Sequence, residues 1–441
     1  MVKLIIASRN SPLALKQVEE VFGLLPKIKY RLLAAPSYGD KHKNISLLAS
    51  PPPNIFTKEL DEIVLRGQAD AAVHSAKDLP YPLPDGLTVA ALLPAGDQRD
   101  ALVSKNNWSL KKLPRGAAVG ASSPLRRREL LARRPDLRIV SLRGNIGERL
   151  QKVDCGQMTA VVVAVCALQR LGLTGRIAEI LPFPTHPLQG HLAVTTRADR
   201  RDLLKIFRPL DTHRAWGRAA LVGAGPGDPL LLTRQADIYL RRTDVIFYDD
   251  LARTIVEDYA ARKIYAGKRK GRQAHTQETI NEKLYQAVRA GLNVARLKGG
   301  DPFIFGRGGE ELEYLQRRLV TVDVVPGITA ASAAAALAKI PLTKRGQSAS
   351  VALLSGHPAS KIKVPAADTL VYYMAGTTLA EVAAKLLRSG QPPRLPAICV
   401  LNASLPEQRI IRTTLQELKH LKIKTPLILI VGRTAGNDAE I

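Results

Sequence analysis

The sequence predicts an α/β fold throughout, with a parallel or mixed sheet in each half of the chain. Two observations support this prediction. Apolar runs of strand length alternate with amphipathic stretches of helical length along almost the whole chain of 441 residues, as in parallel or mixed sheets covered by helices. In addition, 46% of the residues are hydrophobic, which is enough for the cores of about two to four domains in a chain of this length.

The front half begins with an expected strand at 3–8 and a helix that starts after Ser11. Ser11 is suited to the N-cap, and Pro12 to the first helical position. A second helix should end at Gly67, because glycine readily adopts the left-handed conformation that closes helices. The elements expected after it are a strand with a polar end at 69–80, a strand at 116–123, a basic helix at 124–135, a strand at 137–144 and an apolar run at 159–168.

The back half repeats this alternation of strands and helices. Its expected strands lie at 219–225, 244–249, 293–300, 321–327, 350–356, 369–376, 396–402 and 426–432. Its clearest amphipathic helices are expected at 276–291 and 377–390.

The formal charge of +26 indicates an acidic partner or substrate. Nucleic acid is one candidate, but the basic residues are spread through both halves, and no basic tail, RNA-binding aromatic motif or zinc-finger spacing accompanies them. A small molecule with several carboxylates or phosphates accounts for basic clefts equally well. We therefore expect no nucleic-acid partner.

Nothing in the sequence predicts a membrane span, a secretory leader or a metal site. The apolar runs at 161–167 and 330–338 are far shorter than the roughly 20 residues of a transmembrane helix. Basic residues interrupt the N-terminal apolar stretch too early for a leader. The cysteines Cys155, Cys166 and Cys399 have neither metal-binding nor disulfide spacing. We expect a cytoplasmic protein with reduced thiols, no membrane partner and no metal.

Two glycine-rich loops follow expected strands in the back half. The first, VGAGPGDP at 222–229, approaches a dinucleotide-binding motif, but Asp228 stands where the third glycine is required and would repel a pyrophosphate. NAD is therefore disfavoured, and a cationic or zwitterionic ligand without phosphate fits better. The second, RLKGGDPFIFGRGGEE at 296–311, places two glycines beside Asp301 at a strand end, where α/β folds bind ligands.

From Ala219 to the C-terminus, several motifs follow one another in order: VGAGPGDPLLLT, FYDDL, GKRKG, VARLKGGDPFIFGRGGEE, VVPGITAASAAAALAKIPLTKRG, LLSGHP and YYMAG. This set resembles the uroporphyrinogen-III C-methyltransferase family. The resemblance implies transfer of methyl groups from S-adenosylmethionine to two pyrrole rings of uroporphyrinogen III, giving precorrin-2 for sirohaem or cobalamin. It also implies the tetrapyrrole methyltransferase fold of two α/β subdomains, and a homodimer.

The resemblance also implies roles for single residues. Asp249 in YDDL matches the family's candidate base and Lys268 in GKRKG its cationic partner near the substrate; taken alone, Asp249 could instead cap the next helix and Lys268 could be a solvated charge. Ala403 stands where such enzymes often have glycine. The positions that resemble the family's cofactor contacts are Pro226, Gly299, Gly300, Asp301, Ile304, Thr329, Ala330, Met374 and Ala403.

The front half resembles a second family. ASRNSPLALKQ, FTKELDEIVLRGQADAAVHSAKDLP, DQRDALV, RRPDLRIVSLRGNIGERLQK and ALQRLGL are similar to hydroxymethylbilane synthase, also called porphobilinogen deaminase. The resemblance implies two periplasmic-binding-protein-like lobes over residues 1–210, the first completed by the segment around 191–197. It implies Asp78 as the carboxylate that steers pyrrole protonation and deamination. The basic residues that match positions holding the substrate's carboxylates are Arg9, Lys58, Lys77, Arg126, Arg143, Arg149 and Arg170.

The resemblance to the deaminases stops near residue 207, close to where that family's third domain begins. That third domain carries the cysteine to which a dipyrromethane primer is linked. Here a short linker at 211–218 leads directly into the methyltransferase-like half at 219–441. Cys155 and Cys166 lie outside any primer motif, so a dipyrromethane cofactor is not expected.

These observations leave three interpretations. The first is a fusion whose back half methylates uroporphyrinogen III and whose front half binds acidic pyrroles, either alone or with a separate protein that supplies the missing deaminase domain. The second is a fully bifunctional hydroxymethylbilane synthase and methyltransferase with a different primer anchor. The third is a binding or nucleic-acid module without catalytic activity.

Overall fold

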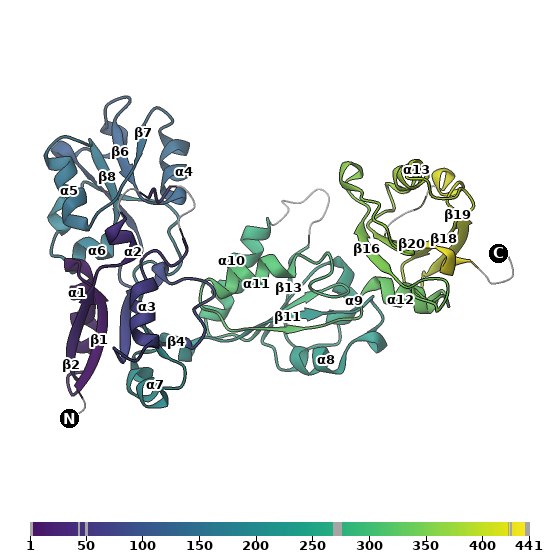
Figure 1. The fold of residues 1–441 in the computed structure, drawn as a ribbon, viewed down its shortest axis with the longest axis horizontal. Helices are drawn as coiled ribbons and strands as arrows, with labels where there is room; N and C mark the ends of the chain where they lie inside the picture. Colours follow the sequence, from purple (N-terminus) through teal and green to yellow (C-terminus); the bar gives the residue numbers. More distant parts are fainter. Residues whose placement is uncertain are drawn as a thin grey trace. The chain divides into compact units, whose positions relative to one another are not determined.

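The computed structural model describes residues 3–42, 45–48, 52–267, 276–421, 423 and 426–436. The chain divides into two compact units, Met1–Ala215 and Trp216–Ile441, and each is described by itself. Strands and helices alternate in both units, and the described strands form four five-stranded sheets (Figure 1). The predicted α/β class is therefore confirmed.

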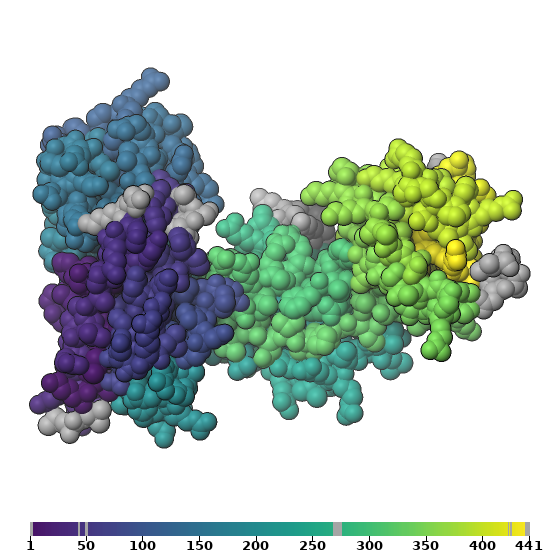
Figure 2. Space-filling view, viewed as in Figure 1, coloured from purple at the N-terminus to yellow at the C-terminus, as the bar shows by residue number. Residues whose placement is uncertain are grey.

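The first lobe of the front unit is built from two separate stretches of chain. The strands of its sheet, in spatial order, are β2 (Lys29–Ala35), β1 (Lys3–Arg9), β3 (Ala71–Ser75), β10 (Leu192–Arg197) and β4 (Leu87–Leu92). β10 pairs antiparallel with both β3 and β4, so the segment around 191–197 completes this lobe as predicted. In Figure 2 the teal segment that contains α7 (Arg201–Phe207) lies against the purple first lobe.

Three helices cover this sheet or lead out of it. α1 (Pro12–Gly23) begins as expected, because the Ser11 hydroxyl accepts a hydrogen bond from the amide of Ala14 at 3.3 Å. α2 (Tyr38–Lys41) is a single turn, and α3 (Lys58–Leu65) is followed by Gly67 in the left-handed conformation. Leu4, Ile6 and Val18 belong to the core that the sheet shares with α1 and α7.

The second lobe is inserted between β4 and β10 of the first. Its strands, in spatial order, are β7 (Arg138–Ser141), β6 (Ala118–Ala121), β8 (Ala160–Ala164), β5 (Asp100–Ser104) and β9 (Glu179–Leu181). Its helices are α4 (Pro124–Arg133), α5 (Ile146–Asp154) and α6 (Val165–Arg170). The apolar run at 159–168 forms β8 and then most of α6, all of it deeply buried except Thr159.

The back unit begins with a fully parallel sheet. Its strands, in spatial order, are β13 (Arg262–Tyr265), β12 (Val245–Tyr248), β14 (Val294–Lys298), β11 (Ala219–Gly223) and β15 (Val322–Val325). The helices of this subdomain are α8 (Arg234–Arg241), α9 (Arg253–Val256), α10 (Gln277–Arg289) and α11 (Gly308–Gln316). Separate apolar clusters cover the two faces of the sheet, so β11 and β12 are apolar without alternation, whereas β14 carries Arg296 and Lys298 on one face.

The second subdomain of the back unit has a mixed sheet. Its strands, in spatial order, are β16 (Val351–Ser355), β17 (Thr369–Tyr373), β20 (Leu427–Gly432), β18 (Pro396–Leu401) and β19 (Arg409–Thr414). Only β16 and β17 run parallel; the other pairs are antiparallel. α13 (Leu379–Arg388) packs on one face, and α12 (Ala330–Leu337) packs on the other. Across the described ranges, none of the helices combines the length and apolar character that crossing a membrane requires.

A buried ion pair stabilises the second lobe. Arg126 donates from Nε and Nη2 to the two carboxylate oxygens of Asp100, at 2.8 and 2.6 Å. Asp100 is 2% exposed and Arg126 is 7% exposed. The amide of Gln189 also donates to Asp100, at 2.8 Å. A guanidinium buried to this extent depends on its carboxylate, because an uncompensated charge in the interior is costly.

We therefore expect Asp100→Ala to destabilise the front unit by about 3–5 kcal/mol, since it leaves the guanidinium of Arg126 buried and unpaired. Urea unfolding would be followed in a Trp216→Phe background, where Trp108 of the second lobe is the remaining tryptophan. As a control, Asp199→Ala removes an ion pair with Arg197 that is mostly exposed, and it should change the midpoint little. Equal midpoints for the two variants would contradict the prediction.

Candidate functional site

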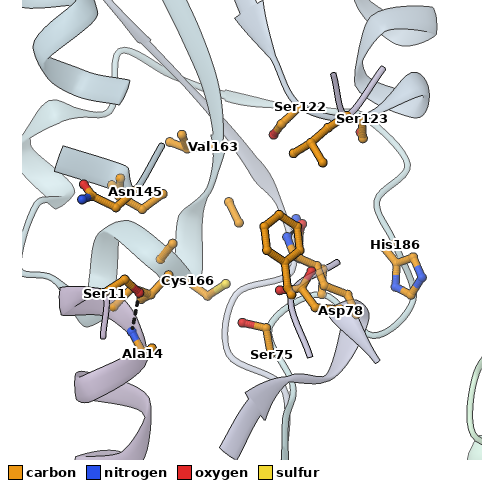
Figure 3. Close-up of a pocket in the computed structure, with 18 of the residues that line it drawn as sticks. Ser11, Ala14, Ser75, Asp78, Ser122, Ser123, Asn145, Val163, Cys166 and His186 are labelled. Atoms are coloured by element: carbon orange, nitrogen blue, oxygen red, sulfur yellow. Dashed lines mark hydrogen bonds between the residues drawn. The ribbon is translucent and has the colours of Figure 1, made fainter. Parts of the chain in front are cut away.

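A cavity of about 470 Å³ lies in the front unit and is lined by residues of both lobes (Figure 3). Asp78 reaches it from the turn that follows β3, and Cys166 reaches it from α6. Six of the seven predicted basic residues also line it: Arg9, Lys77, Arg126, Arg143, Arg149 and Arg170. Lys58, the seventh, does not, because it begins α3 with its side chain exposed. The predicted set therefore meets in one cavity, with Lys58 outside it.

Carboxylates outside the predicted set hold three of these cations. Arg9 pairs with Asp40 through both carboxylate oxygens. Arg126 pairs with Asp100 as described above. On the second lobe, Arg170 donates to Glu20 of α1 at 2.6 Å, and therefore links the lobes. These pairs fix the guanidinium groups in place and use part of their charge.

Arg143 and Arg149 have no such partner among the described residues. Arg143 donates to the carbonyl oxygens of Gly39 and His42. Arg149 donates to the carbonyl of Gly144 at 2.8 Å and to the Ser122 hydroxyl at 3.2 Å. Both side chains therefore keep their charge available for a ligand.

The cavity is electropositive. Its lining includes six cationic side chains but only three carboxylates, those of Asp40, Asp78 and Asp100. Burial, followed by repulsion from nearby arginines, lowers the pKa of Arg149 to about 10. Burial also lowers the pKa of Lys77, whose ammonium donates to Gln189 at 2.9 Å. A ligand with several carboxylates would relieve this repulsion and match the forked geometry of the guanidinium groups.

In the back unit, three backbone segments approach one another so closely that only glycine fits. A Cβ added to Gly223 would lie 2.5 Å from the Cα of Gly327, and one added to Gly327 would lie 2.2 Å from the carbonyl oxygen of Gly300. Gly300 and Gly225 exchange backbone hydrogen bonds of 2.7 and 3.2 Å. The ends of β11, β14 and β15 therefore meet through backbone alone at Gly223, Gly225, Gly300 and Gly327. We call this meeting point the backbone floor.

Asp301 and Thr329 lie at the edge of this floor. The carboxylate of Asp301 accepts hydrogen bonds from the amides of Phe303 at 2.8 Å and Gly327 at 3.1 Å. Thr329, the N-cap of α12, shares a hydrogen bond of 2.5 Å with the hydroxyl of Tyr373. Asp301 therefore links the loop after β14 to the loop after β15, and Thr329 links the loop after β15 to β17 of the second subdomain.

The remaining predicted cofactor positions lie around the same loops. Ile304, Ala330 and Ala403 pack against one apolar cluster of the second subdomain. Gly227, next to Pro226, approaches the side chain of Leu405, and the amide of Asp228 donates to the Ser404 hydroxyl at 3.1 Å. Gly299 lies against Leu251, and Met374 follows β17 with a positive φ and a side chain that is 47% exposed.

Asp249 follows β12 at the same edge of the parallel sheet. Its side chain does not cap the next helical turn. Its Oδ2 accepts a hydrogen bond of 3.3 Å from Arg296, while its buried Oδ1 has no hydrogen-bond partner among the described residues. Arg296 thus holds one oxygen, and the other oxygen is buried, while the side chain as a whole is 27% exposed. Lys268, the predicted partner of Asp249, lies outside the described residues.

Sequence reasoning missed the residues that hold the predicted ones. Asp40, Asp100 and Gln189 in the front unit, and Arg296 with Asp249 in the back unit, make contacts between separate motifs. Arg296 and Glu311 lie at the two ends of one motif, RLKGGDPFIFGRGGEE, but nothing in that motif indicated that they pair. One signal was present. In VARLKGG, Arg296 and Lys298 alternate with apolar residues on an expected central strand, and buried cations there require a counter-charge.

A buried carboxylate lies behind the front cavity. Asp61 is 2% exposed, and burial raises its pKa to about 6. Its Oδ1 lies 3.8 Å from Nε2 of His74, which lines the cavity. Burial, with repulsion from Arg9, lowers the pKa of His74 to about 4. Near neutral pH, His74 is therefore uncharged and gives Asp61 no cationic partner.

Comparison with known families divides the chain in two. Residues 4–205 match the family described as porphobilinogen deaminase, dipyromethane cofactor binding domain. Residues 219–419 match the tetrapyrrole (corrin/porphyrin) methylases.

Individual relatives match about half of the chain. Siroheme synthase 1 of Halorhodospira halophila is 44% identical over 248 residues, covering 53% of this chain and 51% of that protein. The S-adenosyl-L-methionine-dependent uroporphyrinogen III methyltransferase of Arabidopsis thaliana chloroplasts is 42% identical over 233 residues, covering 49% and 63%. A crystal structure of uroporphyrin III C-methyl transferase from Thermus thermophilus is 38% identical, covers 49% of this chain and 98% of that one, and has a TM-score of 0.45. The chain thus spans about half the length of the siroheme synthases it matches.

For Asp61 we predict a pH-dependent effect. Its raised pKa means that the folded state favours the protonated carboxyl, so this stability is present below pH 4 and is lost as the pH rises through 6. Asp61→Asn should match the parent at pH 4 and exceed its free energy of unfolding by about 2–3 kcal/mol at pH 7. Urea unfolding at both pH values tests this, with exposed Asp85→Asn as the control. A gain that is the same at both pH values would exclude titration of Asp61 as its cause.

Proposed function

Because residues 4–205 belong to the porphobilinogen deaminases and residues 219–419 to the tetrapyrrole methylases, we propose that the chain acts in tetrapyrrole biosynthesis. Its back half transfers methyl groups from S-adenosylmethionine to uroporphyrinogen III and forms precorrin-2, for sirohaem or cobalamin. Its front half binds acidic pyrroles. In this proposal the functional boundaries are 1–210 for the deaminase-like half, 211–218 for the linker and 219–441 for the methyltransferase, in a cytoplasmic protein.

The observation that carries the proposal is the backbone floor at the ends of β11, β14 and β15. Gly300 is only half-buried, and a Cβ added there would lie 3.8 Å from the amide nitrogen of Ala330, so a ligand has room to approach the backbone at this position. Asp301 lies beside it, and the exposed side chains of Leu251 and Met374 lie on the loops that follow β12 and β17. This combination of carboxylate, peptide groups and apolar surface suits a molecule with a cationic centre, an amino acid portion and an aromatic base.

S-adenosylmethionine supplies an activated methyl group on a cationic sulfur. The chain therefore has to align the pyrrole carbon with that methyl group, exclude water and accept the proton that the pyrrole loses. We assign the proton to the carboxylate of Asp249, whose side chain is partly exposed and whose Oδ2 is held by Arg296. Lys268 remains the proposed cationic partner, and Pro226, Ile304, Thr329, Ala330 and Ala403 remain proposed cofactor contacts.

The front cavity supports the binding of a polycarboxylate. Arg143 and Arg149 keep their charge available, and Arg9, Lys77, Arg126 and Arg170 surround them. Acetate and propionate side chains of pyrroles fit this lining. We further propose that the methyltransferase half forms a homodimer, and that a separate protein supplies the deaminase domain that the chain replaces at its junction.

We expect Asp249→Asn to lower kcat for S-adenosylmethionine-dependent methylation of uroporphyrinogen III by about 10²–10⁴-fold, the usual contribution of a positioned base. Binding of S-adenosylmethionine, measured by calorimetry, should be unchanged, because the amide keeps the shape of the carboxyl group. Exposed Asp258→Asn is the control. Lack of turnover in the unmodified chain would refute the methyltransferase, and full turnover in Asp249→Asn would refute the base.

One observation favours the alternative, a fully bifunctional enzyme. Cys166 is 6% exposed and lines the same cavity as Asp78, whereas Cys155 is exposed and is not part of that lining. A thioether could form if the sulfur of Cys166 bonded to the aminomethyl carbon of porphobilinogen while ammonia left with the thiol proton. The cavity would then hold a primer without a third domain.

The alternative predicts a dipyrromethane-sized mass increment on protein purified from cells supplied with porphobilinogen. The increment should map to Cys166, vanish in Cys166→Ser and persist in Cys155→Ser. Porphobilinogen consumption should then be abolished by Asp78→Ala. An unmodified intact mass would reject this anchor and leave the front half as a binding domain.

A further inference from the structure

A buried cluster of charges lies directly behind Asp249. β14 alternates its side chains, so Arg296 and Lys298 share the face on which Val294 packs against α10 and α11. Arg296 is 5% exposed and Lys298 is 3% exposed. Two cations on one buried face of a central strand are costly unless a carboxylate compensates them.

Glu311 of α11 supplies that carboxylate and is fully buried. Its Oε1 accepts hydrogen bonds from Nε of Arg296 at 3.1 Å and from Gln277 at 2.9 Å. Its Oε2 accepts one from Nζ of Lys298 at 2.9 Å. Both oxygens of Glu311 are therefore engaged, and both cations are anchored to the same side chain.

The remaining nitrogens of Arg296 leave its guanidinium no freedom to rotate. Nη1 donates to the carbonyls of Leu297 at 2.9 Å and Phe247 at 3.4 Å. Nη2 donates to Oδ2 of Asp249 at 3.3 Å. The orientation of the Asp249 carboxylate is thus fixed through Arg296 by Glu311, although Glu311 has no direct contact with Asp249 in the described structure.

We propose that Glu311 is a positioning residue for methyl transfer, which holds Arg296 so that the Asp249 carboxylate keeps the orientation in which it accepts the pyrrole proton. This inference rests on the function proposed above for Asp249. Glu311 also balances the net charge of this buried cluster. Two carboxylates offset two cations, and loss of Glu311 would leave an excess positive charge beside the base.

Glu311→Gln keeps the shape of the side chain and removes its charge. We expect kcat to fall by about 10–100-fold while KM changes little, because the variant alters the base and not the binding surface. In an Asp249→Asn background, Glu311→Gln should have almost no further effect, since both changes act through the same group. Glu313→Gln on the same helix is the matched control, because its ion pair with Arg317 is exposed. An unchanged kcat, or losses that multiply in the double variant, would overturn the proposal.

A second measurement does not depend on turnover. The Asp249 carboxyl carbon can be titrated by NMR in ¹³C-aspartate-labelled protein and assigned by its absence in Asp249→Asn. The pKa of Asp249 should fall in Glu311→Gln, which removes a negative charge, and rise in Arg296→Gln, which removes a positive one. The charged or titratable groups near Asp249 in the described ranges are Arg296 and Lys298 on β14, Glu311 on α11, the adjacent Tyr248 and Asp250, and Tyr265 on β13.

These measurements distinguish the positioning role of Glu311 from the methyltransferase function of the chain. Methylation by the unmodified chain, with no pKa change for Asp249 in Glu311→Gln, would reject the role of Glu311 and keep the function. The expected pKa changes without methylation by the unmodified chain would reject the function and keep the coupling between Glu311 and Asp249. If Glu311→Gln failed to fold, Arg296→Gln would test the same coupling from its other member, and an unchanged pKa there would overturn it.

Discussion

A guanidinium or ammonium group deep inside a protein is costly unless a carboxylate compensates it, and each unit of this chain contains a buried cluster in which a carboxylate does so. In the second lobe, Asp100 holds Arg126. Behind the parallel sheet of the back unit, Glu311 holds Arg296 and Lys298. The partners of each pair lie on different elements. The buried cation is therefore compensated only when both elements are packed in their native positions.

The same requirement decides which of the many basic residues are paired with carboxylates and which remain able to bind a ligand. Many basic residues form exposed ion pairs that contribute little, such as Arg197 with Asp199. In the front cavity, three arginines are paired with carboxylates, and Arg143 and Arg149 are not. The charge that remains for a ligand is therefore concentrated on Arg143 and Arg149, while the paired arginines line the same cavity.

Most of the fold follows from local patterns in the sequence. The N-cap at Ser11, the left-handed Gly67 and the apolar strands of the parallel sheet all depend on neighbours a few residues away. The glycine loops of the back unit were also recognisable, because a strand end with glycine and aspartate has few structural uses. The return of the chain into the first lobe near residue 191 was inferred from family resemblance, and no local rule predicts it.

The supporting contacts of the candidate sites could not be predicted in the same way. Glu20 meets Arg170 across 150 residues, and Thr329 meets Tyr373 across 44. Such partners are selected by tertiary packing, which brings together segments whose sequences carry no mutual signal. Lys58 illustrates the reverse case. Its motif matched, but the first turn of α3 leaves its side chain exposed and away from the cavity.

The place of β10 in the first sheet has a consequence for how the protein is made. β10 lies between β3 and β4, so the sheet remains open at its centre until residues 192–197 have been synthesised. By then every strand of the second lobe, from 100 to 181, has already been synthesised and precedes β10 out of the ribosome. During translation the inserted lobe can therefore fold first, and the N-terminal lobe closes around the strand that arrives last.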